Sequence, residues 1–201
     1  MTPLPSDPPA GLDRRAVVAR LVRDRGEMLV VSSLGAATYD LAAAGDHPRN
    51  FYLWGAMGGA MAMGLGLALA QPSVPVLVLA GDGEALMGLG SFATIAVQRP
   101  ANLSVVILDN RLYGETGSQH SHTAWGVDLA AVAAGCGVAE TATVDDGAGL
   151  DRLAARIVRP GNGPCVTVVR IGGEEMPRCL PVRDGAWLKA RMRASLDLGP
   201  L

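Results

Sequence analysis

Two carboxylates lie in a glycine turn, Gly-Asp-Gly-Glu at residues 81–84, directly after an apolar run. In nucleotide-binding folds, a glycine turn at this place usually binds phosphate. A carboxylate beside a phosphate is repulsive unless a cation lies between them. Asp82 and Glu84 therefore lead us to predict a metal ion at this turn.

Two other interpretations of the turn stay open at this point. An isolated Gly-Asp-Gly can be only a tight strand-to-helix connection, with glycines for positive φ and an acid at a helix start. A dinucleotide fold would show the same order of strand, glycine turn, helix and strand. The dinucleotide interpretation is weaker, because the third glycine of its motif falls on Leu86 and because Asp82 occupies the turn itself.

A second polar residue, Asn110, follows the next strongly apolar run along the chain. If the two runs form adjacent strands, the side-chain oxygens of Asp82 and Asn110 converge on one small cation that prefers oxygen ligands, such as Mg²⁺ or Ca²⁺. That ion would neutralise a diphosphate. Backbone N–H groups at the helix start near Glu84 would donate to the same ligand.

Apolar runs and amphipathic stretches alternate along the chain, which predicts an alternation of strands and helices. Strands are expected at residues 28–32, 49–53, 74–80, 103–108, 139–144 and 165–171, and helices at 12–25, 38–44, 58–70, 86–98, 128–135, 150–158 and 184–195. A polar loop is expected at 110–125. This order predicts an α/β fold, a single doubly wound parallel sheet with helices on both faces, whose ligands bind beyond the carboxyl ends of the strands.

The composition fits one domain at residues 12–201, after a flexible, proline-rich tail at 1–11 that lacks the features of a signal peptide. The net charge of −2 and the 4% aromatic content give no footprint for nucleic acid. Three widely spaced cysteines predict neither a disulfide framework nor a zinc site, so a reducing cytoplasm is expected.

Residues 51–70 carry no charge over about the length that spans a bilayer. They also contain the pair Gly55 and Gly59 at the spacing of membrane helix contacts. The segment is rich in Gly and Ala, however, and Pro72 and Pro75 lead straight into a strand. We expect a helix buried in a globular domain and no membrane span.

The segment from Gly81 to Asn110 resembles the diphosphate-binding motif of thiamine diphosphate enzymes, which begins Gly-Asp-Gly and ends at Asn. The resemblance implies that Asp82, Asn110 and the backbone carbonyl of Leu112 bind Mg²⁺, with Ca²⁺ as the other possibility. The dipeptide Tyr113-Gly114, typical of the family's decarboxylases, follows. The cofactor contacts implied in this region are Gly81, Gly83, Glu84, Ala85, Asn110, Tyr113 and Gly114.

An upstream turn, residues 54–58, resembles the turn that faces the cofactor's pyrimidine in the same family. The resemblance implies that the Gly55 carbonyl accepts a hydrogen bond from the aminopyrimidine, and that Met57 is the apolar wedge that holds the cofactor bent. Considered alone, Met57 would be an ordinary core residue. Gly35, in the segment VVSSLG, is a further expected cofactor contact.

The resemblance is greatest to the beta subunits of sulfopyruvate decarboxylases and the corresponding half of phosphonopyruvate decarboxylases. It runs over residues 30–138 and fades toward the carboxyl end. It rests on VVSSLG, RNFYLWGAMG, GLGLALA, GDGEALMGLGSFATI, LDNRLYGETGSQ and DLAAVAAGCG. Glu84 stands where many relatives have Ser, Ala or Gly, and Ala36 where some have a hydroxyl. We therefore expect Glu84 to make a backbone contact or to carry an outward-facing carboxylate.

The resemblance implies a subunit of a decarboxylase that acts on a 2-oxo acid such as sulfopyruvate or phosphonopyruvate and releases CO2 and an aldehyde. Enzymes of this family pair two domains, and the segments above match the diphosphate-binding domain. Glu84 and Glu115 lie at the wrong end of the cofactor to contact its pyrimidine. We therefore expect a separate alpha-type subunit with the pyrimidine domain, in a hetero-oligomer.

His120 and His122 follow the expected metal loop and are candidates for proton transfer. Solvent-exposed histidines are the alternative; His122 is favoured, because relatives tend to carry one there. Arg111 either meets an anionic substrate tail or lies at the surface beside Asp109. Two other functions stay open, a carboligase of the acetolactate synthase type and a non-catalytic nucleotide-binding domain.

Overall fold

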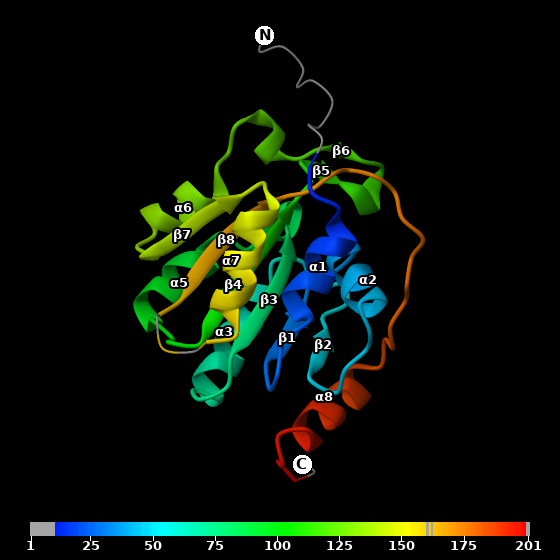
Figure 1. The fold of residues 1–201 in the computed structure, drawn as a ribbon, viewed down its shortest axis with the longest axis vertical. Helices are drawn as coiled ribbons and strands as arrows, with labels where there is room; N and C mark the ends of the chain where they lie inside the picture. The colour runs from blue at the N-terminus through cyan, green and yellow to red at the C-terminus, as the bar shows by residue number, and fades with distance from the viewer. Residues whose placement is uncertain (1–10, 160, 162, 200–201) are drawn as a thin grey trace.

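A single sheet of six parallel strands forms the centre of the molecule (Figure 1), in the order β2-β1-β3-β4-β8-β7. The computed structural model describes residues 11–159, 161 and 163–199. The strands are β1 (Leu29–Ser32), β2 (Asn50–Tyr52), β3 (Val76–Gly81), β4 (Leu103–Asp109), β7 (Glu140–Val144) and β8 (Cys165–Arg170). The expected α/β class and parallel sheet are confirmed, while the expected tail falls, except for Gly11, outside the described residues.

Helices connect the strands and cover both faces of the sheet (Figure 1). They are α1 (Arg14–Val22), α2 (Ala36–Ala43), α3 (Ala60–Ala70), α4 (Asp82–Met87), α5 (Gly90–Gln98), α6 (Leu129–Gly135), α7 (Gly147–Ile157) and α8 (Gly185–Ala194). Several begin at acidic caps. The Asp13 carboxylate accepts from the Ala16 N–H, and Asp146 accepts from the Gly149 N–H, as expected for helix starts.

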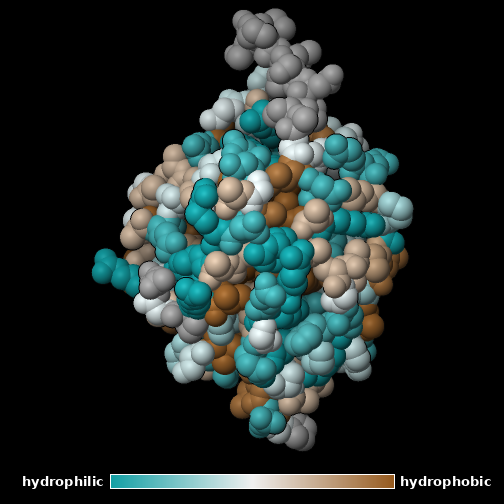
Figure 2. All heavy atoms as spheres, viewed as in Figure 1, coloured by the Kyte–Doolittle hydropathy of each residue, from teal (hydrophilic) through white to brown (hydrophobic). Residues whose placement is uncertain are grey.

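Two apolar cores lie on opposite faces of the sheet, because successive side chains of a strand point to opposite sides. In β3, Val76 and Val78 pack with α3, α5 and α6, whereas Leu77 and Leu79 pack with α1, α2 and α7. Helix α8 packs beside the edge strand β2. Figure 2 shows all atoms in the same view as Figure 1. The surface on this side is largely hydrophilic, with small hydrophobic areas between the polar side chains.

The apolar segment at 51–70 contains most of the short strand β2 and the expected helix α3, which is buried on one side only, since Ala62, Gly66 and Leu69 are exposed. A Cβ at Gly64 would lie 2.1 Å from a methyl carbon of Val78, so α3 needs a glycine there to approach β3. Close packing on the sheet therefore explains the small residues of this segment. Among the described residues, no helix has the length and apolar character needed to cross a membrane.

The structure corrects two expected elements. The helix predicted at 86–98 is two helices, α4 and α5, and α4 already begins at Asp82 within the glycine turn. The break falls at Gly88, where a Cβ would lie 2.6 Å from the carbonyl oxygen of Gly58. The polar loop at 110–125 contains the antiparallel strands β5 (Leu112–Tyr113) and β6 (Gln119–His120) and the 3₁₀ turns η1 (Gly114–Thr116) and η2 (His122–Trp125).

Candidate functional site

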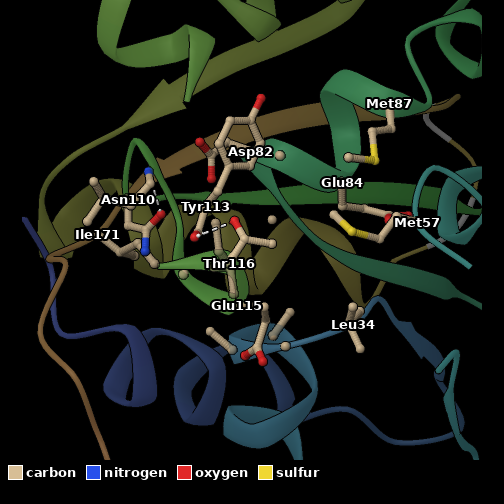
Figure 3. A pocket seen from close by; sticks show the side chains of 18 residues that line it. Leu34, Met57, Asp82, Glu84, Met87, Asn110, Tyr113, Glu115, Thr116 and Ile171 are labelled. Atoms are coloured by element: carbon tan, nitrogen blue, oxygen red, sulfur yellow. Dashed lines mark hydrogen bonds between the residues drawn. The ribbon is translucent and has the colours of Figure 1, made fainter. Parts of the chain in front are cut away.

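The pocket lies beyond the carboxyl ends of β3 and β4, which pair in parallel with Gly81 opposite Leu108. Asp82 follows β3 directly and Asn110 follows β4 directly, so the predicted juxtaposition of the two strand ends is confirmed. Both residues line a cavity of about 350 Å³ (Figure 3). Cavities of this size hold small organic ligands.

The carboxylate of Asp82 is buried beside the pocket, with only 2% of the residue exposed. The Ser121 hydroxyl donates to its Oδ2, and the Thr123 hydroxyl lies 3.2 Å from the same oxygen. Burial raises the pKa of Asp82 to about 6, the Ser121 hydroxyl opposes this rise, and the charge of Asp109 adds to it. A cation beside Asp82 would favour its charged form, so this carboxylate suits a metal ligand.

A second buried carboxylate, Asp109, lies behind Asp82 at the end of β4. Thr123 connects the two, because its hydroxyl is 3.2 Å from Asp82 Oδ2 and 2.8 Å from Asp109 Oδ1. Arg170 at the end of β8 forms an ion pair with Asp109. Arg111 is partly exposed and lies beside Asp109, whose Oδ1 accepts from the Arg111 backbone N–H at 3.0 Å, while the side-chain Nε of Arg111 is buried.

Asn110 begins a tight turn into the small β5–β6 hairpin. Its Oδ1 accepts a hydrogen bond from the Leu112 N–H at 3.0 Å, which fixes the side chain while leaving the oxygen a second lone pair. Leu112 also lines the pocket. Within the described residues, no group of three or more His, Cys, Asp or Glu side chains gathers as a metal site. An ion here would instead need amide and backbone oxygens beside one carboxylate.

Gly83 leaves room for the ring of Tyr113. A Cβ at residue 83 would lie 2.7 Å from both Cδ1 and Cε1 of that ring, well inside carbon–carbon contact distance. The Tyr113 hydroxyl is 2.8 Å from Nδ1 of His122, and the two rings meet edge to face. The second glycine of the turn is therefore required by a side chain that lines the pocket.

The rim opposite the glycine turn is formed by the start of α2 and by Glu115. A Cβ at Gly35, whose φ is +81°, would lie 3.1 Å from Cγ of Glu115. The Glu115 carboxylate accepts from the Tyr39 hydroxyl at 3.4 Å and lies 3.6 Å from the guanidinium of Arg178. Three distant segments of the chain thus meet at this rim.

Most of the residues predicted to bind the cofactor or the metal line the pocket. They are Gly35, Met57, Gly81, Asp82, Gly83, Glu84, Asn110, Leu112, Tyr113 and Gly114. Two others do not: Gly55 is exposed in its turn, at φ +73°, and Ala85 is fully buried in the core. The role of each remains a prediction.

The carboxylate of Glu84 does not face outward, so the second of the two expected alternatives is wrong. The residue is 3% exposed, and its two oxygens accept hydrogen bonds from the backbone N–H groups of Gly58 and Ala60, at 2.6 and 3.0 Å. Figure 3 shows this carboxylate beside Met57. The second acid of the turn therefore contacts protein backbone.

The two candidate histidines lie beside the pocket but outside its lining. His120 pairs with Leu112 in the β5–β6 hairpin. His122 is exposed at the start of η2, with its Nδ1 at the Tyr113 hydroxyl. Their proposed part in proton transfer stays a prediction.

Sequence reasoning missed the residues behind the site. Ser121 and Thr123 orient Asp82, and Arg170 neutralises Asp109. The only hint in the sequence was that Ser121 and Thr123 carry hydroxyl groups in the polar segment that follows Asn110. The sequence does not show that these side chains point toward Asp82, because the segment has no periodic pattern from which a buried side could be inferred.

The fold and the site define a class of protein. Residues 32–169 match the family model "Thiamine pyrophosphate enzyme, C-terminal TPP binding domain". The chain therefore belongs to the family of thiamine pyrophosphate enzymes. The match continues to residue 169, further toward the carboxyl end than the expected limit at 138.

Several similar proteins of known name are decarboxylases. The chain is 41% identical over 172 residues to sulfopyruvate decarboxylase subunit beta of Methanothermobacter thermautotrophicus, covering 82% of this chain and 91% of that one. It is 41% identical over 123 residues to the subunit of the same name from Methanocaldococcus jannaschii, covering 61% of this chain and 65% of that one. It is 46% identical over 134 residues to phosphonopyruvate decarboxylase of Streptomyces hygroscopicus, covering 66% of this chain and only 32% of that one. The chain is thus a homologue of decarboxylase subunits.

Solved structures agree in fold. A putative thiamin diphosphate-dependent enzyme from Mycobacterium smegmatis superposes with a TM-score of 0.70 at 25% identity, covering 82% of this chain and 32% of that one. Benzoylformate decarboxylase from Polynucleobacter necessarius superposes with a TM-score of 0.66 at 20% identity, which supports the fold alone. This chain spans about one third of the length of either neighbour.

Proposed function

We propose that this chain is the diphosphate-binding subunit of a thiamine diphosphate-dependent 2-oxo acid decarboxylase. The observation that carries the proposal is the meeting of Asp82 and Asn110 at two adjacent strand ends, in the lining of one cavity. A buried carboxylate and an amide oxygen at this place suit a hard divalent cation better than they suit a bare phosphate.

The cation would be held by three oxygens of this chain. They are Asp82 Oδ1, which no side-chain donor among the described residues engages, Asn110 Oδ1 and the backbone carbonyl of Leu112. Mg²⁺ suits such a set because it keeps water and phosphate oxygens as its remaining ligands, and Ca²⁺ is the alternative. Ser121 and Thr123 hold the other carboxylate oxygen, so Asp82 keeps its orientation before the ion arrives.

The remaining pocket residues fit an organic cofactor. Gly83 and Gly35 leave room for the side chains of Tyr113 and Glu115, which line the pocket together with Met57 (Figure 3). Thiamine diphosphate supplies an electron sink for the pair released as CO2 leaves a 2-oxo acid. This chain would bind and orient the cofactor, and its bound cation would neutralise the charge of the diphosphate.

The substrate class and the partner come from the relatives. Those at 41% identity are named sulfopyruvate decarboxylase subunit beta, and that at 46% phosphonopyruvate decarboxylase, which supports a 2-oxo acid with an anionic tail. The subunit name, together with the 91% span of one such subunit, supports a hetero-oligomer in which an alpha-type subunit brings the pyrimidine domain. Cys136, Cys165 and Cys179 form no disulfide, which supports a cytoplasmic location.

Calorimetric titration of the chain with thiamine diphosphate, with Mg²⁺ and with excess chelator, tests the proposal. We expect binding only with the metal, and loss of that binding in Asp82→Ala. Asp146→Ala is the matched control, because Asp146 caps α7 and does not line the pocket. A cofactor affinity that is unchanged both by the chelator and by Asp82→Ala would refute the proposed metal site.

Activity and products test the finer claims. The isolated chain should be inactive, and adding the partner subunit should give CO2 and an aldehyde from sulfopyruvate or phosphonopyruvate. Robust decarboxylation by the isolated chain would refute the need for a partner. A condensation product from pyruvate would favour the carboligase alternative, and binding of a dinucleotide without Mg²⁺ would favour the non-catalytic one.

A further inference from the structure

Glu84 connects two segments that lie far apart in the sequence. It belongs to the first turn of α4, yet its Oε2 accepts from the Gly58 N–H at 2.6 Å and its Oε1 accepts from the Ala60 N–H at 3.0 Å. The residue is 3% exposed. Hydrogen bonds between a buried carboxylate and backbone N–H groups are charge-assisted and stronger than neutral ones.

Helix α3 has no capping side chain of its own. It begins at Ala60 after two glycines, and no side chain of its own N-cap residue, Gly59, can accept a hydrogen bond. The first N–H groups of a helix need acceptors, and a negative charge there is stabilising. Glu84 therefore caps α3 from α4, which fixes the separation between the two helix starts.

A backbone contact with the end of α4 is made at the same residue, Gly58. A Cβ at Gly58 would lie 3.1 Å from the carbonyl carbon of Met87, and one at Gly88 would lie 2.6 Å from the Gly58 oxygen. The turn at residues 54–58 thus packs against the end of α4 through Gly58, and Glu84, in the first turn of α4, bonds to the N–H of the same glycine. Met57 directly precedes Gly58, the residue held by both contacts, and it lines the pocket.

We propose that Glu84 is a positioning residue that sets Met57 relative to the cation site at Asp82. Asp82 and Glu84 lie in the same first turn of α4, so one rigid element would hold the metal with one carboxylate and the apolar wedge with the other. This inference rests on the proposed function, because the wedge acts on the ring of the cofactor. Both oxygens of Glu84 accept from backbone N–H groups, whose dipoles offset part of its negative charge toward the diphosphate.

Amide hydrogen exchange of the full chain measures the attachment without any ligand. Glu84→Gln keeps the size of the side chain but turns an NH2 group toward one of the two N–H donors. We expect the amides of Gly58 and Ala60 to exchange about tenfold faster, while amides of β3 and β4 keep their protection. Unchanged exchange at both positions would overturn the inference.

Binding of two ligands separates positioning from a general loss of stability. Magnesium pyrophosphate occupies only the cation end, whereas magnesium thiamine diphosphate also contacts the wedge. In Glu84→Gln we expect affinity for thiamine diphosphate to fall about tenfold, the loss of one charge-assisted bond, and affinity for pyrophosphate to change less than about twofold. Asp146→Ala, which removes a helix cap elsewhere, should leave the ratio of the two affinities unchanged.

A double-variant cycle with Met57→Ala completes the test. If Glu84 acts through Met57, the double variant should bind thiamine diphosphate no more weakly than Met57→Ala alone. Additive losses, or equal losses for both ligands in Glu84→Gln, would overturn the positioning role. Equal affinity of the wild-type chain for the two ligands would also overturn the positioning role, whereas a wild-type chain that binds neither ligand with Mg²⁺ would contradict the proposed function.

Discussion

Replacing Gly83 with Ala places a methyl group against the ring of Tyr113. The new Cβ would lie 2.7 Å from two ring carbons, whereas carbon atoms in contact are separated by about 3.5–4.0 Å. The ring must therefore move by about 1 Å. Because its hydroxyl is held at 2.8 Å from Nδ1 of His122, that shift also strains this hydrogen bond and the short strand β5.

Two opposing terms set the expected stability of Gly83→Ala. Overpacking of this kind costs about 1–3 kcal/mol. Residue 83 lies within α4, where Ala is favoured over Gly by about 1 kcal/mol. We therefore expect a net destabilisation of about 0–2 kcal/mol. Gly66→Ala is the matched control, because it lies within α3 and a Cβ there meets nothing within 4 Å.

Urea unfolding and cofactor titration separate these terms. Gly66→Ala should raise the free energy of unfolding by about 1 kcal/mol and leave the affinity for magnesium thiamine diphosphate unchanged. Gly83→Ala should bind the cofactor at least about tenfold more weakly, because the displaced Tyr113 ring lines the pocket. If Gly83→Ala matches Gly66→Ala in both measurements, the glycine is not required by the ring and our reasoning is wrong.

Three other outcomes are expected. Ser121→Ala removes a hydrogen bond to the Asp82 carboxylate, so calorimetry should show Mg²⁺-dependent cofactor binding weakened by about tenfold; unchanged affinity would contradict the orienting role. Arg170→Met leaves Asp109 buried without its ion pair, which should lower the free energy of unfolding by about 2–3 kcal/mol, somewhat less than for a fully buried pair, and Asp109→Asn should restore part of the loss. Burial lowers the pKa of His47 below 6.5, so the unfolded chain takes up the proton first and stability should fall as pH drops below about 6.5; a thermal shift profile of His47→Gln that keeps the same slope would exclude this histidine as the cause.

Part of the site could be predicted from local pattern alone. The apolar runs before Asp82 and Asn110 fixed both residues at strand ends, and a single helix between the runs made adjacent parallel strands the simplest arrangement. The structure confirms that arrangement. Spacing along a strand needs no knowledge of distant contacts, so these positions were accessible from the sequence.

The partners of the buried charges could not be predicted in this way. Arg170 is separated from Asp109 by 61 residues, and Glu84 from Gly58 by 26. Whether a carboxylate turns outward or inward depends on its rotamer and on which backbone groups nearby lack acceptors. The split of the expected helix at Gly88 likewise follows from its contact with the Gly58 carbonyl, a contact between separate segments.

The α/β fold, the parallel sheet and the two strand ends that define the pocket follow from local patterns of residues, because hydrophobic periodicity and glycine turns act over short stretches of chain. The side chains that surround the acids of the turn depend instead on the three-dimensional packing of the chain. It directed Asp82 toward hydroxyl groups and the pocket, and Glu84 toward the start of α3. The physical reason is that a buried charge is stable only beside its donors, and here most of those donors come from other elements of the fold.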